Sequence, residues 1–177
     1  MKPLRARYAR IERVVSNLLD EYQVAEAPVP IERIVKGHGI TLQSGNLGDV
    51  SGLLARSAGK TIIGVNANHP ITRRRFTIAH EFGHFMLHEG MHSHVDKEYR
   101  VNFRSAESAT GTNVPEIEAN FFAASILMPK EFLERDDDAL AAVDNDEGVQ
   151  RLAAKYRVSG HAMSLRLGNV YKSAVPF

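Results

Sequence analysis

Hydrophobic side chains recur along the chain with two spacings, one helical and one typical of strands. The helical spacing covers three long segments and four short ones, at 4–22, 71–89 and 115–127 and at 31–36, 130–134, 147–156 and 160–168. Runs with strand character lie at 40–42, 51–55, 61–65 and 99–104. The short polar turn at 57–60 separates two of these runs and predicts a hairpin. This mixture of short helices and strands predicts an α+β fold.

The predicted elements follow one another without a repeat or a low-complexity linker, so we expect one domain over residues 1–177. A chain of this length can bury a core without covalent staples. The complete lack of cysteine excludes disulfides and any thiolate zinc site. The last two helical segments, 147–168, have the spacing of a helix-turn-helix within that domain. The second of them offers only His161 and Arg166 for contacts with bases or phosphates, which favours a packing role.

Positive and negative charges nearly cancel, because 22 Lys and Arg stand against 21 Asp and Glu. This balance gives no overall field that would attract nucleic acid or a membrane surface. We interpret Arg73–Arg75 as a solvated helix face and the acidic segment 136–146 as a surface loop, since it lacks the residue order of a calcium-binding loop. Charges interrupt the basic amino terminus and no apolar run reaches membrane-spanning length, so a cytoplasmic protein is expected.

Histidines concentrate in one short segment, with five of the eight lying between positions 80 and 94. The sequence HEFGHFMLHEGMHSH in this segment contains H-E-x-x-H twice, at His80–His84 and at His88–His92. On a helix, the two histidines of this motif hold a metal ion and the glutamate acts on a water molecule. Both imidazoles must lie on one face of an intact helix for this to work.

The helical pattern favours the first copy of the motif. His80, Glu81, His84 and His88 fall on one polar stripe of a helix that is otherwise apolar. Unpaired buried polar groups cost about 1–3 kcal/mol each, and a metal ion with its water would satisfy them together. The second copy runs past Gly90, a typical residue after a helix end, and is interpreted as accidental. His80 and His84 are therefore predicted metal ligands, whereas His88 is open between support of the site, a substrate-side contact and an exposed helix end.

A third protein ligand is expected, because a catalytic zinc usually has three such ligands and one open position for water. In one class of zinc peptidases this ligand is a glutamate in the pattern E-x-x-x-D/N, whose last residue supports a ligating histidine. The segment EIEAN fits this pattern with Glu116 and Asn120. The helical wheel places these two on an alanine-lined face and Glu118 on the outward side. Glu116 is the predicted ligand, with Glu118 as its competitor.

Two segments taken together resemble a known family. RFTIAHEFGHFMLH followed by EIEANFFAASILMP is similar to the ImmA/IrrE family of zinc metallopeptidases, over most of the chain from residue 31 onward. The resemblance implies a minimal thermolysin-like zincin domain that holds one zinc ion, with manganese or another divalent ion as the alternative. It also implies that His80, His84 and Glu116 bind the metal and that Glu81 is the general base.

The same resemblance implies a substrate and a setting. Members of the family are cytoplasmic endopeptidases that cleave a partner helix-turn-helix repressor or antitoxin, in mobile-element control, stress responses or toxin–antitoxin-like pairs. Glu81 would take a proton from water and pass it to the leaving amine. The donor that stabilises the oxyanion is open among His88, His92, His94 and Tyr99.

The sequence leaves alternatives open for how a substrate binds and for the overall function. The strand candidates 51–55 and 99–104 could pair with an extended substrate segment. A non-catalytic protein that binds a regulator through the same metal site is the second hypothesis. A small DNA-binding protein that uses its last helices is the third.

Overall fold

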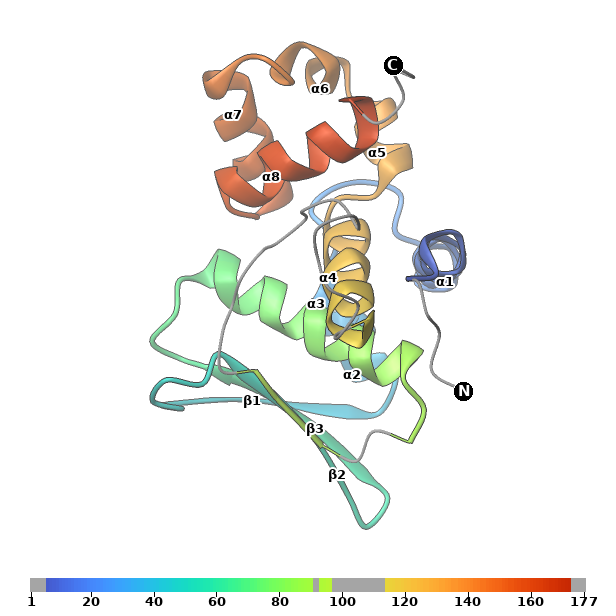
Figure 1. Cartoon of the computed structure of the whole chain (residues 1–177), viewed down its shortest axis with the longest axis vertical. Coiled ribbons are helices and arrows are strands. Elements are labelled where there is room, and N and C mark those ends of the chain that lie inside the picture. Colours follow the sequence, from blue (N-terminus) through green and yellow to red (C-terminus); the bar gives the residue numbers. More distant parts are fainter. Residues whose placement is uncertain (1–5, 91–92, 97–113, 173–177) are drawn as a thin grey trace.

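The computed structural model describes residues 6–90, 93–96 and 114–172, and its first half holds the sheet together with the helices before and between its strands (Figure 1). The helices of this half are α1 (Tyr8–Glu21), α2 (Ile31–Gly37) and α3 (Ile71–Leu87). The strands are β1 (Ile40–Gly45), β2 (Gly52–Ser57), β3 (Lys60–Asn66) and β4 (Ser93–Asp96). The second half contains α4 (Val114–Leu127), α5 (Lys130–Glu134), α6 (Asp137–Ala142), α7 (Asp146–Tyr156), α8 (Gly160–Leu167) and a π-helical turn, Gly168–Lys172. The fold is α+β, as the sequence pattern predicted.

The strands form a mixed sheet with the order β1-β3-β2-β4. β1 runs parallel to β3, whereas β2 runs antiparallel to both β3 and β4. The predicted hairpin is therefore present as β2 and β3. The expectation that segment 51–55 offers a free strand edge is wrong, because β2 is paired on both sides. The outer position next to it belongs to β4, and the predicted strand at 99–104 lies outside the described residues.

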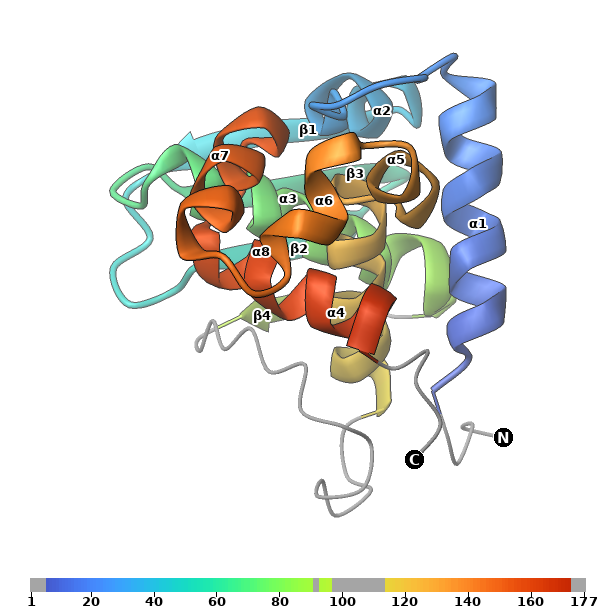
Figure 2. The same cartoon turned by 90° about the horizontal axis from the view of Figure 1, so that it is seen from above.

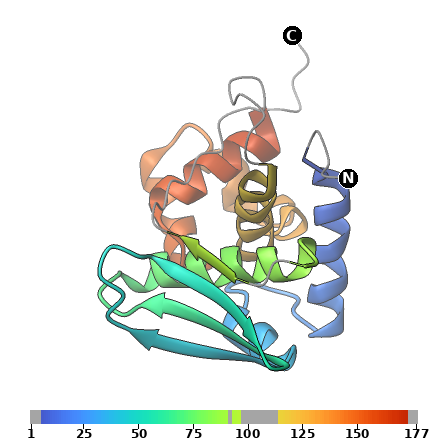
Figure 3. The same cartoon turned by 60° about the horizontal axis from the view of Figure 1, so that its bottom comes forward.

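Helix α3 lies across one face of the sheet, and α4 crosses the opposite side of α3 (Figures 1 and 3). This double coverage explains why α3 is apolar nearly all round, since Phe76, Ala79 and Phe82 are all buried. The helix ends at Leu87, slightly earlier than the pattern predicted, with His88 as its C-cap residue. The second H-E-x-x-H copy thus begins where the helix stops, which agrees with its interpretation as accidental.

The two central helices, α3 and α4, are in close contact at Gly83. A Cβ atom at this position would lie 3.1 Å from Phe122 Cδ1 and 3.2 Å from the Ala119 Cα atom. Because neither residue 83 nor residue 119 has a long side chain, the first turn of α4 can reach the polar stripe of α3. The alanine-lined face of α4 noted in the sequence is the side that makes this contact.

Helices α5 to α8 lie beyond α4, and α1 lies alongside α4 (Figures 1 and 2). The acidic segment that we expected to be a loop contains helix α6. Its N-cap residue Asp136 accepts a hydrogen bond from the Asp138 N–H, while Ala139 and Ala142 are buried. Asp residues are favoured at a helix start, so the acidic run marks a helix beginning rather than a loop.

Helices α7 and α8 are the pair whose spacing in the sequence resembled a helix-turn-helix. Arg157, in the left-handed conformation with φ of 54°, ends α7. Arg166 is buried and donates from Nε to the Met128 carbonyl oxygen at 3.0 Å. Of the two residues considered for DNA contacts, only His161 is exposed. The pair therefore contributes to the core.

One continuous cluster of buried apolar side chains extends from α1 through the sheet and α3 to α8. Among the described residues, no helix has both the length and the apolar character that crossing a membrane requires.

Candidate metal centre

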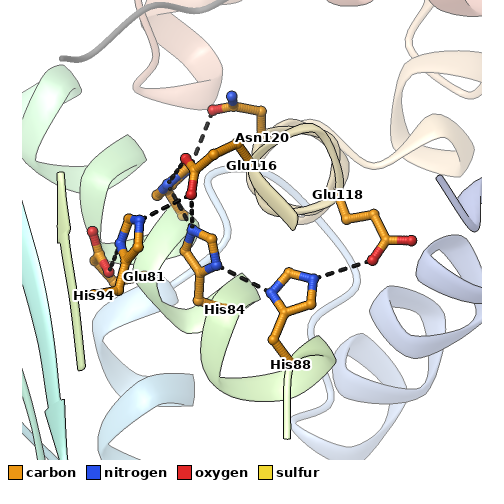
Figure 4. A network of polar contacts seen from close by, with 8 residues as sticks. Glu81, His84, His88, His94, Glu116, Glu118 and Asn120 are labelled. Carbon is orange, nitrogen blue, oxygen red and sulfur yellow. Dashed lines mark hydrogen bonds and ion pairs between the residues drawn. The ribbon is translucent and has the colours of Figure 1, made fainter. Parts of the chain in front are cut away.

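Helices α3 and α4 bring the three sequence-predicted ligands together (Figure 4). His80 and His84 are one turn apart on α3, both buried, and their Nε2 atoms are 3.1 Å apart. Glu116, in the first turn of α4, places Oε2 3.3 Å from His80 Nε2 and Oε1 3.0 Å from His84 Nε2. Two imidazole nitrogens and a carboxylate thus converge on one point.

His94 of β4 joins this group from the side of the sheet. Its Nε2 lies 2.9 Å from Glu116 Oε1, and its Nδ1 lies 3.0 Å from Glu81 Oε2. One donor atom from each of His80, His84, His94 and Glu116 lies within 4.8 Å of the others. Sequence reasoning named His94 only as one of several oxyanion donors, so its place among the metal-binding candidates was missed.

The charges in the cluster favour a cation. Burial opposes ionisation of Glu116, but the surrounding imidazoles of His80, His84 and His94 outweigh it and hold the Glu116 pKa well below its usual range. Burial lowers the pKa of His84 to about 4, despite the neighbouring Glu116, so this ring is neutral at pH 7. Burial also disfavours a charged His94, yet Glu116 and Glu81 raise its pKa to about 10. The ionised Glu116 carboxylate and the neutral His84 ring are donor types that a divalent ion such as zinc accepts, whereas His94 carries a proton at pH 7 in the metal-free protein.

Asn120 fixes the orientation of the first ligand. Its Oδ1 lies 3.0 Å from His80 Nδ1, and an amide oxygen can only accept a hydrogen bond. The proton of a neutral His80 ring therefore sits on Nδ1, which leaves the Nε2 lone pair directed at the cluster. Such a partner on the far nitrogen is typical of metal-binding histidines.

Glu81 borders the cluster on the side of β2 and β4. Its side chain is fully buried, and its Oε2 atom pairs with His94. The backbone of β2 comes near it at Gly52, where an added Cβ would collide with the Thr77 methyl group and lie 3.5 Å from Glu81 Oε1. Glu81 is thus within reach of the cluster without being one of its converging donors.

His88 lies behind His84, on the side away from the cluster (Figure 4). Its Nδ1 is 3.1 Å from His84 Nδ1, and its Nε2 is 3.1 Å from Glu118 Oε2. Burial lowers the pKa of His88, although Glu118 opposes this effect. Of the three roles left open by the sequence, this position fits support of the site.

The prediction that Glu118 faces outward is wrong. Glu116 and Glu118 leave opposite sides of α4, but Glu118 is fully buried because Arg7, just before α1, covers it. Burial opposes its ionisation, yet hydrogen bonds from the Arg7 side chain and backbone lower the Glu118 pKa to about 2. A helical wheel of α4 alone could not show a partner that is 111 positions away in the sequence. Glu118 does not belong to the converging donors.

In a comparison with protein-family models, the chain matches the peptidase model Peptidase_M78, described as the IrrE N-terminal-like domain. It covers residues 35–168, which is well over half of the chain. The matched segment includes the sheet, α3, α4 and the helices up to α8. A search of curated proteins found no match.

Proposed function

The chain belongs to the IrrE N-terminal-like peptidase family, and from this premise we propose that it is a zinc-dependent endopeptidase that cleaves a helix-turn-helix transcriptional repressor. The observation that carries the proposal is the convergence of His80, His84 and Glu116 on one point, with Glu81 beside it. Catalytic zinc sites usually have three protein ligands and one open position for water, and an adjacent glutamate can act as the base.

In this proposal His80, His84 and Glu116 hold the ion, and Asn120 orients His80. Zinc fits the nitrogen and oxygen donors, and manganese or another divalent ion is the alternative. When bound, the metal lowers the pKa of a water molecule toward neutrality and polarises the scissile carbonyl. The buried carboxylate of Glu81 would accept a proton from the attacking water and deliver it to the leaving amine.

His94 is the residue we assign to the developing oxyanion. Its ring lies between Glu81 and Glu116, with Nε2 on the side of the cluster. An N–H group on this nitrogen can donate to the carbonyl oxygen of a substrate bound at the cluster. His88 is a poorer candidate because His84 stands between it and the cluster. His92 and Tyr99, also considered from the sequence, lie outside the described residues.

The substrate segment would bind in extended form along β4. This strand is at one end of the described sheet order, and it carries His94 beside the cluster. Main-chain hydrogen bonds to an edge strand hold peptides without strict sequence demands. The repressor or antitoxin as substrate, the cytoplasmic setting and a role in mobile-element, stress or toxin–antitoxin-like regulation come from the resemblance to the family. The near-neutral net charge of +1 supports a protein partner over nucleic acid.

A second function is favoured by His94 itself. With His80, His84 and Glu116 it gives four donor atoms within 4.8 Å of one another. Four protein ligands close a tetrahedral zinc site, as in structural sites that carry out no chemistry. In that case the chain would be a metal-stabilised protein that binds a regulator without cleaving it.

Incubation of the zinc-loaded protein with the helix-turn-helix repressor encoded nearest to its gene tests the proposal. We expect discrete fragments by intact-mass spectrometry, which disappear when the metal is chelated. A stable complex of the two intact chains would favour the second function.

A further inference from the structure

A chain of hydrogen bonds runs from the amino-terminal segment to the back of the metal centre. Arg7 contacts Glu118 through three N–H groups: its backbone N and Nε lie 2.8 and 2.9 Å from Oε1, and its Nη2 lies 2.7 Å from Oε2. His88 Nε2 lies 3.1 Å from Glu118 Oε2. On its other side, His88 Nδ1 lies 3.1 Å from His84 Nδ1. His84 then faces Glu116 with Nε2.

The direction of each hydrogen bond follows from the donors and acceptors. An ionised carboxylate only accepts, so His88 must donate to Glu118 from Nε2. The neutral His88 ring then has a lone pair on Nδ1, and the bond between the two rings must be donated by His84 Nδ1–H. This places the His84 lone pair on Nε2, which is the atom directed at the metal centre.

We propose that Arg7, Glu118 and His88 act as a positioning relay that holds His84 in the ring orientation and tautomer required of a metal ligand. The relay serves the second histidine as Asn120 serves the first. Unlike Asn120, Arg7 lies outside the segment 35–168 that the family model matches. The inference rests on the proposed function, since the metal at His84 is part of that function.

Burial gives the relay its strength. Glu118 and His84 are fully buried, and the side chain of His88 is 11% exposed, so water competes little for these bonds. Nη2 of Arg7 also lies 3.4 Å from the carbonyl oxygen of Leu87, the last residue of α3. The same guanidinium therefore connects the end of α3 with the start of α4, the two elements that carry the ligands.

Two substitutions of His88 separate positioning from packing. His88→Phe keeps a ring of similar shape but removes both nitrogens. His88→Gln restores an oxygen that accepts from His84 and an amide that donates to Glu118. With a chromophoric chelator as competitor, we expect His88→Phe to bind zinc about 10–100-fold more weakly, the usual effect of losing such a partner. His88→Gln should retain most of the affinity.

Arg7→Ala tests the far end of the relay, with Arg10→Ala, at an exposed position in the first turn of α1, as its matched control. We expect Arg7→Ala to weaken zinc binding and Arg10→Ala to leave it unchanged. Thermal unfolding of each metal-free variant checks that the fold is retained.

The tautomer of His84 can be read directly in the metal-free protein by long-range ¹H–¹⁵N spectra of its histidines. The relay predicts an Nδ1–H ring in the unaltered protein and in His88→Gln, and a mixture of tautomers in His88→Phe. Equal zinc affinity of His88→Phe and the unaltered protein, or equal losses in both His88 variants, would overturn the relay. A correct tautomer without zinc binding by the unaltered protein would instead overturn the proposed function and leave the relay standing.

Discussion

His94 lies directly opposite Leu54 in the ladder between β2 and β4, and this pairing turns its imidazole toward α3. Opposed residues of neighbouring strands share a face of the sheet. Leu54 is fully buried, whereas Val95, the next residue after His94, is 51% exposed. The strand alternation therefore carries His94 to the two carboxylates, Glu81 and Glu116.

Replacing His94 distinguishes a metal site with three protein ligands and one free position from a site with four protein ligands. If His94 serves the oxyanion, His94→Ala should leave zinc affinity nearly unchanged and lower kcat/KM for repressor cleavage by about 10²–10³. His161→Ala on α8, an exposed position, is the matched control. A loss of zinc affinity of tenfold or more in His94→Ala would identify His94 as a fourth ligand and support the non-catalytic function.

The close contact of α3 and α4 makes Gly83 sensitive to a single methyl group. A Cβ there would lie within 3.1–3.3 Å of Phe122 and Ala119, so Gly83→Ala should push α4 away from α3. We expect a loss of about 1–3 kcal/mol in unfolding free energy, together with weaker zinc binding as Glu116 moves. Gly168→Ala, where a Cβ meets nothing within 4 Å, is the control in urea denaturation.

Acid sensitivity should reveal the buried Glu118. Its pKa is about 2 in the folded protein against an ordinary value of 4.5, so its ionised form stabilises the fold. That stabilisation is complete above pH 4.5 and is lost as the pH falls toward 2. Urea denaturation of metal-free protein at pH 7 should show Glu118→Gln less stable by roughly 2 kcal/mol, allowing for solvent near the partly exposed Arg7.

The difference in unfolding free energy between Glu118→Gln and the unaltered protein should shrink between pH 4.5 and 2, because the protonated carboxyl resembles the amide. The exposed Glu134→Gln is the control and should differ little at any pH. A difference that stays constant down to pH 2 would contradict the assigned ionisation of Glu118.

Metal binding should stabilise the fold, because the ligands come from separate elements. At 100 times its Kd, zinc would stabilise the folded state by about 2.7 kcal/mol. For a chain of 177 residues this corresponds to an increase in Tm of about 5–10 °C, lost on adding a chelator. Calorimetry with and without zinc measures it, and an unchanged Tm would argue against a metal centre at this site.

Local periodicity accounts for what the sequence predicted well. The polar stripe on α3 and the alanine-lined face of α4 each lie within one helix, so counting residues was enough to find both faces. The E-x-x-x-D/N pattern of zinc peptidases supplied the link between Glu116 and the two histidines, which lie together in the structure. The hairpin of β2 and β3 was also visible, because its turn and both of its strands are contiguous.

The features that sequence reasoning missed depend on partners far away in the chain. The four residues of β4 are too few to show a pattern, and only pairing with β2 reveals which way His94 points. The burial of Glu118 depends on Arg7, which precedes a different helix. Helix α6 was missed because an acidic run resembles a solvated loop until its buried alanines are known.

The central claim is that Glu81 acts as a base at a metal held by His80, His84 and Glu116. Zinc content and cleavage of the repressor by Glu81→Gln test it most directly, since the amide keeps the shape of the side chain but cannot take a proton. The account predicts one zinc ion per chain and a loss in kcat/KM of about 10²–10⁴. A variant that keeps its zinc and still cleaves at the unaltered rate would contradict it.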